Sequence, residues 1–273
     1  MSYSVEHTIQ DGIERIAYRP HKRKFKTPIL MQHGMWHGAW SWQPWQELFA
    51  KWGWESHAYS LPGHGKSTQR RSYRWCTLQY YYQFLAAEIK RMSRPPVLMG
   101  HSMGGALTQW HLKKRSDDIA AAVLVASWPS RSTMLSLFRV CRRYPLSALR
   151  SFLTLSAQQV VATPRRVGEL FITENALLSP QELHAGLCPD SLLIVLQYQP
   201  PFWKPPLHTR TPILWLGGSK DVITYEPIHR ASAVDYGADY LMVEEAGHDL
   251  MLEKSSRQTA ESIHKWLAGK KIV

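Results

Sequence analysis

Three glycines surround one serine in the stretch VLMGHSMGGAL, residues 97–107. Gly100, Ser102 and Gly104 fit the pattern G-x-S-x-G, in which a strand turns sharply into a helix and the serine hydroxyl is thrust outward from a strained bend. The positions beside such a bend must carry almost no side chain, and glycine meets that requirement. The pattern predicts that Ser102 is a nucleophile, and the alternative is an ordinary helix N-cap.

A serine hydroxyl needs a base to take its proton and a third group to orient that base. In enzymes known to carry a nucleophilic serine at such a bend, the acid and then the histidine follow the serine along the chain. Asp221 closely follows the apolar run ILWLGG, and His248 lies in the loop after the run DYLMVEE. Order and position therefore predict a triad of Ser102, Asp221 and His248. Asp249 is a competing acid, but we expect it to point elsewhere because it is the chain neighbour of His248.

Attack on a carbonyl produces an oxyanion that two fixed backbone N–H groups must stabilise. Met103 follows the proposed nucleophile and is expected to supply one donor. Met35 follows the pair His33–Gly34 at the end of another apolar run and is expected to supply the second. We expect His33 and His37 to brace this loop by hydrogen bonds rather than to take part in the chemistry.

Short apolar runs alternate with helix-like runs along most of the chain, and this rhythm predicts a mostly parallel, doubly wound sheet with helices on both faces. A hairpin is expected first, over residues 3–20, because Asp11–Gly12 supplies the turn. Strands are expected at 27–34, 54–60, 95–99, 121–127, 211–218 and 239–245, and helices at 42–51, 78–92, 103–114, 225–234 and 255–268.

The segment 128–209 breaks this rhythm. It is rich in leucine, arginine and proline, and it holds helix-like pieces at 134–144, 148–160 and 191–199. We expect a helical lid inserted into a core formed by 1–127 and 210–273. Several aromatic and methionine side chains could line an acyl pocket beneath it, or they could form the lid's own small core: Trp36, Trp128, Met134, Leu135, Phe138 and Trp203.

Taken together, the stretches HGMWHGAWSW, LPGHGKS, GHSMGG, LGGSKD and AGHDLMLE resemble the α/β-hydrolase superfamily, in particular its serine esterases and lipases. The resemblance covers residues 2–127 and 210–270. It implies the α/β-hydrolase fold and a serine hydrolase that needs no cofactor or metal and cleaves small-molecule carboxylic esters through an acyl-enzyme on Ser102. Dehalogenases and epoxide hydrolases of this fold use an aspartate nucleophile, so the serine argues against both.

The run HG-x-x-HGAW also resembles plant-type methylesterases and the related hydroxynitrile lyases. Those lyases carry threonine at the position of Gly34 and lysine at that of Asp249, so lyase chemistry is not expected here. Two alternatives stay open. One is a small-molecule receptor on a hydrolase fold. The other is a related reaction of the same triad, as in a thioesterase, a perhydrolase or a cofactor-free dioxygenase.

The chain of 273 residues has a net charge of +12, from 33 Lys and Arg against 21 Asp and Glu. Basic clusters at 19–26, 69–74, 113–115 and 139–144 could contact an anionic membrane peripherally or could form a solvated surface. No nucleic-acid partner is expected, because no recognised nucleic-acid-binding motif accompanies them.

The three widely spaced cysteines and the lack of a visible secretory signal favour a cytoplasmic location. The sequence does not indicate an oligomeric state.

Overall fold

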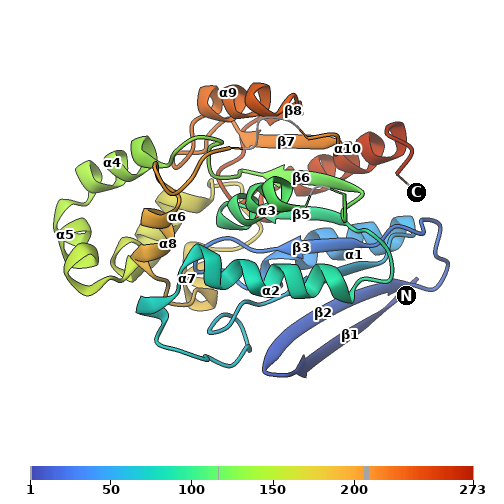
Figure 1. The fold of residues 1–273 in the computed structure, drawn as a ribbon, viewed down its shortest axis with the longest axis horizontal. Coiled ribbons are helices and arrows are strands. Elements are labelled where there is room, and N and C mark those ends of the chain that lie inside the picture. The colour runs from blue at the N-terminus through green and yellow to red at the C-terminus, as the bar shows by residue number, and fades with distance from the viewer. Residues whose placement is uncertain (1, 116, 206–208, 273) are drawn as a thin grey trace.

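A computed structural model describes residues 2–115, 117–205 and 209–272. Within these residues the strands form one eight-stranded sheet in the order β1-β2-β4-β3-β5-β6-β7-β8 (Figure 1). The ladder from β4 to β8 is parallel, whereas β2 pairs antiparallel with both β1 and β4. The strands are β1 Tyr3–Gln10, β2 Ile13–Pro20, β3 Ile29–Gln32, β4 Ser56–Tyr59, β5 Val97–His101, β6 Ala121–Val125, β7 Ile213–Gly218 and β8 Asp239–Val243.

The first two strands form the hairpin expected from the sequence. Asp11 and Gly12 both have positive φ, 52° and 69°, and Gln10 pairs directly with Ile13. A two-residue turn with left-handed backbone matches the twist of the strands that it joins, which explains the Asp-Gly pair.

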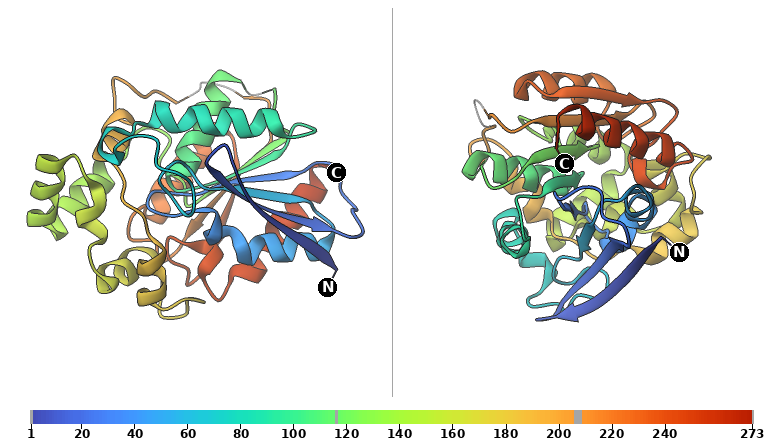
Figure 2. Two further views of the ribbon diagram at one scale, coloured as in Figure 1. Left: turned by 90° about the horizontal axis from the view of Figure 1, so that it is seen from below. Right: turned by 90° about the vertical axis from the view of Figure 1, so that its right-hand side faces the viewer.

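Helices cover both faces of the sheet, as the alternating rhythm predicted. Successive residues of a central strand point to opposite faces, so Val97 and Met99 join one apolar core and Leu98 joins the other. The first core includes side chains of α1 and α10, and the second includes side chains of α2, α3 and α9 (Figures 1 and 2). These helices are α1 Gln43–Trp52, α2 Leu78–Arg91, α3 Met103–Lys114, α9 Glu226–Tyr236 and α10 Ser256–Gly269.

Between β6 and β7 the chain forms a helical segment, which we call the lid, at one end of the sheet (Figures 1 and 2). Its helices are α4 Met134–Arg143, α5 Pro145–Thr154, η3 Ala157–Val161, α6 Pro164–Phe171, α7 Pro180–Gly186 and α8 Leu192–Gln197. Among helices in the described parts of the chain, none combines the length and the apolar character needed to traverse a lipid bilayer.

The lid helices differ in part from the sequence-based expectation. The single helix expected at 148–160 is wrong, because Leu155 takes a left-handed conformation with φ of 52° and ends α5 there. Helices α6 and α7 were not predicted. Each starts with a proline, Pro164 or Pro180, which fits a first helical turn because its missing N–H would have no helical partner there.

Candidate functional site

Ser102 lies in a sharp bend between β5 and α3. Its backbone has φ of 51° and ψ of −116°, a conformation that non-glycine residues rarely adopt. Two long-range hydrogen bonds hold it: its N–H donates to Val125 O at 3.0 Å, and its C=O accepts from Trp128 N at 3.2 Å. The side chain makes no capping hydrogen bond to the helix. The N-cap alternative therefore does not account for this serine.

The glycines of the motif allow main chains to approach closely. A Cβ on Gly100 would lie 2.4 Å from Gly104 O, and one on Gly104 would lie 2.2 Å from Gln32 O. A Cβ on Gly34 would lie 2.9 Å from Cβ of Ser102. The loop after β3 thus packs directly against the bend that carries the serine, and only glycine permits this distance.

Asp221 and His248 are in hydrogen-bond contact, as their order in the sequence suggested. His248 Nδ1 lies 2.8 Å from Asp221 Oδ2, and both side chains are buried. The other carboxylate oxygen accepts the N–H groups of Ile223 and Thr224 at 2.8 and 3.0 Å. Burial by itself raises the pKa of Asp221, but the charge and hydrogen bonds of His248 and His229 hold it well below its ordinary value. The carboxylate is therefore ionised, and Nδ1–H of His248 donates to it.

The remaining ring nitrogen of His248 is available as a base. Nε2 is buried and has no hydrogen-bond partner in the described part of the chain. The backbone carbonyl of the same residue lies 3.2 Å from Nε2 of His101, the residue before Ser102. The loop that carries His248 therefore packs against the nucleophile bend.

His229 was missed by the sequence reasoning. Trp215 Nε1 donates to its Nδ1 at 3.0 Å, so its Nε2 carries the proton and faces Asp221 Oδ2 at 3.3 Å. His229 lies on α9, and nothing in the local sequence marks it. Only the packing of that helix against β7 brings it to Asp221.

Asp249 does not face the ring of His248, as expected, but forms a second buried network. His37 Nε2 donates to Asp249 Oδ2 at 2.9 Å, and His37 Nδ1 lies 2.7 Å from Met35 O. Burial favours neutral His37, but the charge and hydrogen bond of Asp249 raise its pKa, so both ring nitrogens can donate. His37 thereby braces the loop after β3.

The same network is the one candidate metal cluster found among the described residues. One ligand atom each from His37, His101 and Asp249 lies within 4.8 Å of the others. The facing atoms of His37 and Asp249 already share a hydrogen bond, and His101 Nε2 lies 3.3 Å from the carboxylate. The hydrogen bond of His37 to Asp249 occupies two of the three candidate ligand residues, so we interpret the cluster as a brace. Asp249 Oδ1 and His101 Nδ1 are buried without a hydrogen-bond partner among the described residues.

The loop after β3 carries the proposed second oxyanion donor, Met35. His33 holds its start: Leu61 N–H donates to His33 Nε2 at 3.0 Å, and Nδ1 lies 2.7 Å from Gly34 O. Burial, followed by the charge of nearby His64, lowers the pKa of His33 well below its usual value. The ring is therefore neutral, with Nε2 as the acceptor and Nδ1–H as the donor. The Met35 N–H donates to no described backbone group.

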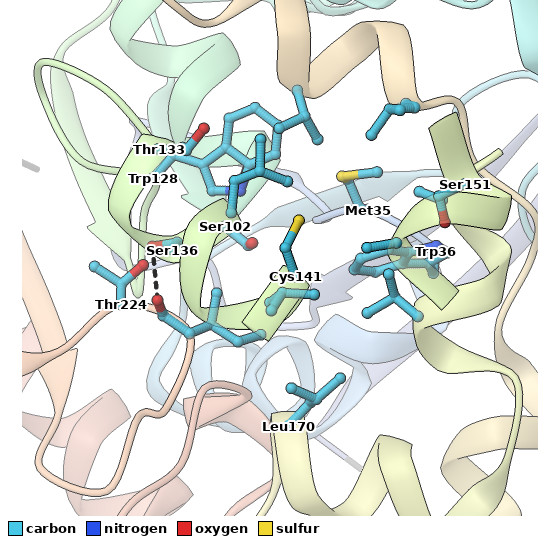
Figure 3. Close-up of a pocket in the computed structure, with 18 of the residues that line it drawn as sticks. Met35, Trp36, Ser102, Trp128, Thr133, Ser136, Cys141, Ser151, Leu170 and Thr224 are labelled. Carbon is cyan, nitrogen blue, oxygen red and sulfur yellow. Dashed lines mark hydrogen bonds between the residues drawn. The ribbon is translucent and has the colours of Figure 1, made fainter. Parts of the chain in front are cut away.

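A pocket opens at Ser102 beneath the lid (Figure 3). Ser102 lies among the side chains of Met35, Trp128 and Cys141. No charged side chain is present among the described residues that line the pocket. The lining includes apolar side chains from several lid helices: Leu137, Val140, Phe152, Val160, Leu170, Leu192 and Val195.

The expected pocket residues divide into two groups. Trp36 and Trp128 line the pocket. The assignment of Met134, Leu135 and Phe138 is corrected, because these residues are 53%, 49% and 63% exposed and do not line it. Helical spacing turns them away, while Leu137, Val140 and Cys141 on the same helix face inward.

Trp203 does not line the pocket either, so its assignment is also corrected. It is buried in the lid's contact with α3. Its ring stacks on Tyr198 with 4.7 Å between centroids, and Nε1 donates to Ser130 O at 2.7 Å. Trp203 belongs to the apolar core that the sheet shares with α2 and α3, so the alternative considered from the sequence, a separate small core of the lid, does not hold for this tryptophan either.

Comparison with known proteins agrees with this architecture. A sequence model described as the alpha/beta hydrolase family matches residues 29–262. A Mycoplasma pneumoniae protein provisionally named esterase/lipase 2 is 32% identical over 126 residues, which is 45% of this chain and 46% of that protein. The alignment thus spans about half the length of this curated relative.

Solved structures of low sequence identity share the fold. A monoacylglycerol lipase from Paleococcus ferrophilus superposes with a TM-score of 0.70 at 20% identity, over 94% of this chain and 98% of the other. A thermophilic esterase from Thermogutta terrifontis superposes with a TM-score of 0.68 at 17% identity, over 97% and 98%.

Proposed function

The chain belongs to the alpha/beta hydrolase family, and from this premise we propose that it is a serine hydrolase that cleaves carboxylic esters through an acyl-enzyme on Ser102. The observation that carries the proposal is the state of His248. His248 Nδ1–H donates to Asp221 Oδ2, with 2.8 Å between nitrogen and oxygen. Nε2 is buried and has no hydrogen-bond partner among the residues that the structure describes, and the loop that carries His248 packs against the Ser102 bend.

The proposed reaction has two halves. Ser102 Oγ attacks the ester carbonyl while His248 Nε2 takes its proton, and Asp221 stabilises the imidazolium that forms. The N–H groups of Met35 and Met103 stabilise the oxyanion, and loss of one such donor typically costs about 10²–10³ in kcat. The alcohol leaves with the proton from His248, and water then cleaves the acyl-enzyme by the same route.

The pocket lining supports an uncharged, apolar acyl group as substrate. A charged acyl chain would lose its hydration among these side chains and gain no ionic partner.

A panel of p-nitrophenyl esters with acyl chains of increasing length tests this function. We expect kcat/KM to rise from acetyl to medium-length chains as the apolar pocket fills, and Ser102→Ala to reduce turnover to background. A small-molecule receptor would bind without turnover. Matched thioester and peracid assays would distinguish the related reactions, because the same triad can perform them.

We also propose peripheral contact with an anionic membrane, through the outer face of α4 and α5. Residues 131–154 contain five arginines and no aspartate or glutamate. Large apolar side chains on these two helices are exposed and do not line the pocket: Met134, Leu135, Phe138, Leu146, Leu149 and Leu153. Apolar groups beside cations suit a surface with anionic headgroups.

Two sequence-based expectations remain proposals. The division into a core of 1–127 and 210–273 and a lid of 128–209 agrees in outline with the position of the helices between β6 and β7. A cytoplasmic location is consistent with three unpaired cysteines.

A further inference from the structure

A buried carboxylate of the lid bonds directly to the loop after β3. Asp190, which precedes α8, is fully buried. Its Oδ2 accepts the backbone N–H of Trp36 at 2.9 Å, although the two residues are 154 positions apart. Trp36 is the residue after Met35, the proposed oxyanion donor.

Two further donors satisfy this carboxylate. His64 Nε2 lies 3.0 Å from Oδ2, and the Tyr81 hydroxyl donates to Oδ1 at 3.0 Å. Burial, followed by the charge of Asp190, raises the pKa of Tyr81 well above its usual value, so the hydroxyl remains a donor. A buried carboxylate is tolerated only where such partners replace its hydration.

The lid also holds the other side of Trp36. The Cys188 N–H donates to Trp36 O at 2.7 Å, so residues 188 and 190 together bond both the N–H and the C=O of Trp36. The backbone of Trp36 has φ of 65°, in the left-handed region that a tryptophan rarely adopts. Such a conformation persists only where the surroundings enforce it, and here the lid contributes two of the contacts that do so.

We propose that Asp190 is a positioning residue for the oxyanion hole: from the lid, its carboxylate fixes Trp36 so that the adjacent Met35 N–H faces the carbonyl attacked by Ser102. This inference rests on the proposed hydrolysis at Ser102. It also makes the oxyanion hole dependent on the docked lid, because residues 188–190 belong to the lid segment.

The alternative is that Asp190 only attaches the lid to α2 and to the loop after β4. Tyr81→Phe separates the two roles, because it removes one hydrogen bond to the same carboxylate and leaves the Trp36 contact intact. Asp190→Leu removes every acceptor with a side chain of the same branching but larger volume, whereas Asp190→Asn is close in volume and keeps one oxygen for the Trp36 N–H.

The test compares these three variants with the wild type on a short p-nitrophenyl ester. It also measures amide hydrogen exchange, by mass spectrometry, of peptides that cover residues 33–40. We expect Asp190→Leu to lower kcat about 10- to 100-fold with KM within about threefold, and to accelerate exchange in this loop. Asp190→Asn and Tyr81→Phe are expected to keep kcat within about threefold of the wild type and to leave loop exchange unchanged.

Unchanged kcat in Asp190→Leu, or an equal loss in Tyr81→Phe, would overturn the positioning role while Ser102-dependent turnover of the wild type still stood. If the wild type showed no such turnover, the proposed function would fail. Independently of turnover, unchanged loop exchange in Asp190→Leu would overturn the claim that Asp190 fixes the backbone of Trp36. If Asp190→Leu does not fold, Asp190→Ser carries the same prediction, because serine is too short to reach Trp36 and leaves room for water beside His64.

Discussion

The charge of each histidine near Ser102 follows from its burial and its partner. Burial lowers the pKa of His101 to about 3, against the pull of Asp249 in the other direction. Its ring is therefore neutral near pH 7, and its Nε2–H can hold the backbone of His248 without placing a positive charge beside the proposed base. His37, bonded to the same aspartate, has a raised pKa.

The depressed pKa of His101 makes stability depend on pH. An unfolded histidine titrates near pH 6.5, so between pH 6.5 and 3 the unfolded state binds a proton that the folded state excludes. The corresponding stability is present above pH 6.5 and falls as the pH drops. The wild type should lose unfolding free energy between pH 7 and pH 5. We expect the corresponding loss in His101→Asn to be smaller by about 1–2 kcal/mol. Urea denaturation at the two pH values measures this, and equal losses in both proteins would refute it.

Residues of the site differ in how well the sequence could indicate them. Ser102, Asp221 and His248 could be proposed because each lies beside an apolar run and in a set order. His229 and Asp190 could not, because their contacts depend on how α9 and the lid pack on the sheet. Neither position carries a local pattern of glycine or apolar residues that would distinguish it.

At the scale of elements, the site depends on how closely β3, β5 and α3 approach one another. Helix α3 comes closest to β3 and its following loop at Gly104, where a Cβ would lie 2.2 Å from Gln32 O and 2.7 Å from His33 O. Both neighbours are backbone atoms of β3 and its following loop, which cannot rotate away as a side chain could. The position of the oxyanion loop is therefore tied to the packing of the nucleophile helix.

Gly104→Ala should force α3 away from β3. We expect a loss of stability of about 1–3 kcal/mol, typical of an overpacked core, and a fall in kcat of tenfold or more as the loop that carries Met35 shifts. Gly269→Ala, at the end of α10, is the matched control, because a Cβ there would have no atom of the described residues within 4 Å. It should leave kcat unchanged and stability equal or slightly higher. Thermal unfolding and ester turnover of both variants decide this, and similar behaviour of the two would contradict the packing argument.

Elements of the core could be predicted better than those of the lid. Buried strands and amphipathic helices alternate in the core. The apolar content of each segment and the spacing of its apolar residues therefore identify them. In the lid, the break at Leu155 depends on a left-handed residue that no glycine marks. Helices α6 and α7 are short and begin at prolines, so they carry no long apolar period that would mark them as helices. The outward direction of Met134, Leu135 and Phe138 likewise depended on the helix orientation.

At the scale of the whole molecule, the exposed apolar side chains are unevenly placed. Many of them belong to α4 and α5, which lie at the lid end of the molecule (Figure 1). Other residues of the same two helices, among them Ser136, Cys141 and Ser151, line the pocket (Figure 3). If this face contacts a membrane, an ester would have a short path from the lipid surface to Ser102.

Vesicle binding tests the membrane contact. We expect the wild type to bind vesicles of phosphatidylcholine with about 30% phosphatidylserine more tightly than phosphatidylcholine alone, with weaker binding at higher salt. The double variant Leu149→Glu and Leu153→Glu should bind at least about tenfold more weakly and still hydrolyse a short soluble ester, because neither residue lines the pocket. Val234→Glu is the control, because it makes the same kind of change at an exposed position of α9. Co-sedimentation that is equal for the double variant and the control would argue against this surface.

Covalent labelling tests the acyl-enzyme at Ser102 most directly. The wild type would be incubated with a fluorophosphonate, digested, and mapped by peptide mass spectrometry. We predict one stoichiometric adduct on Ser102, with labelling slowed by about 10³-fold or more in His248→Ala, which lacks the base. An adduct on another residue, or labelling of Ser102 at the same rate without His248, would contradict the account.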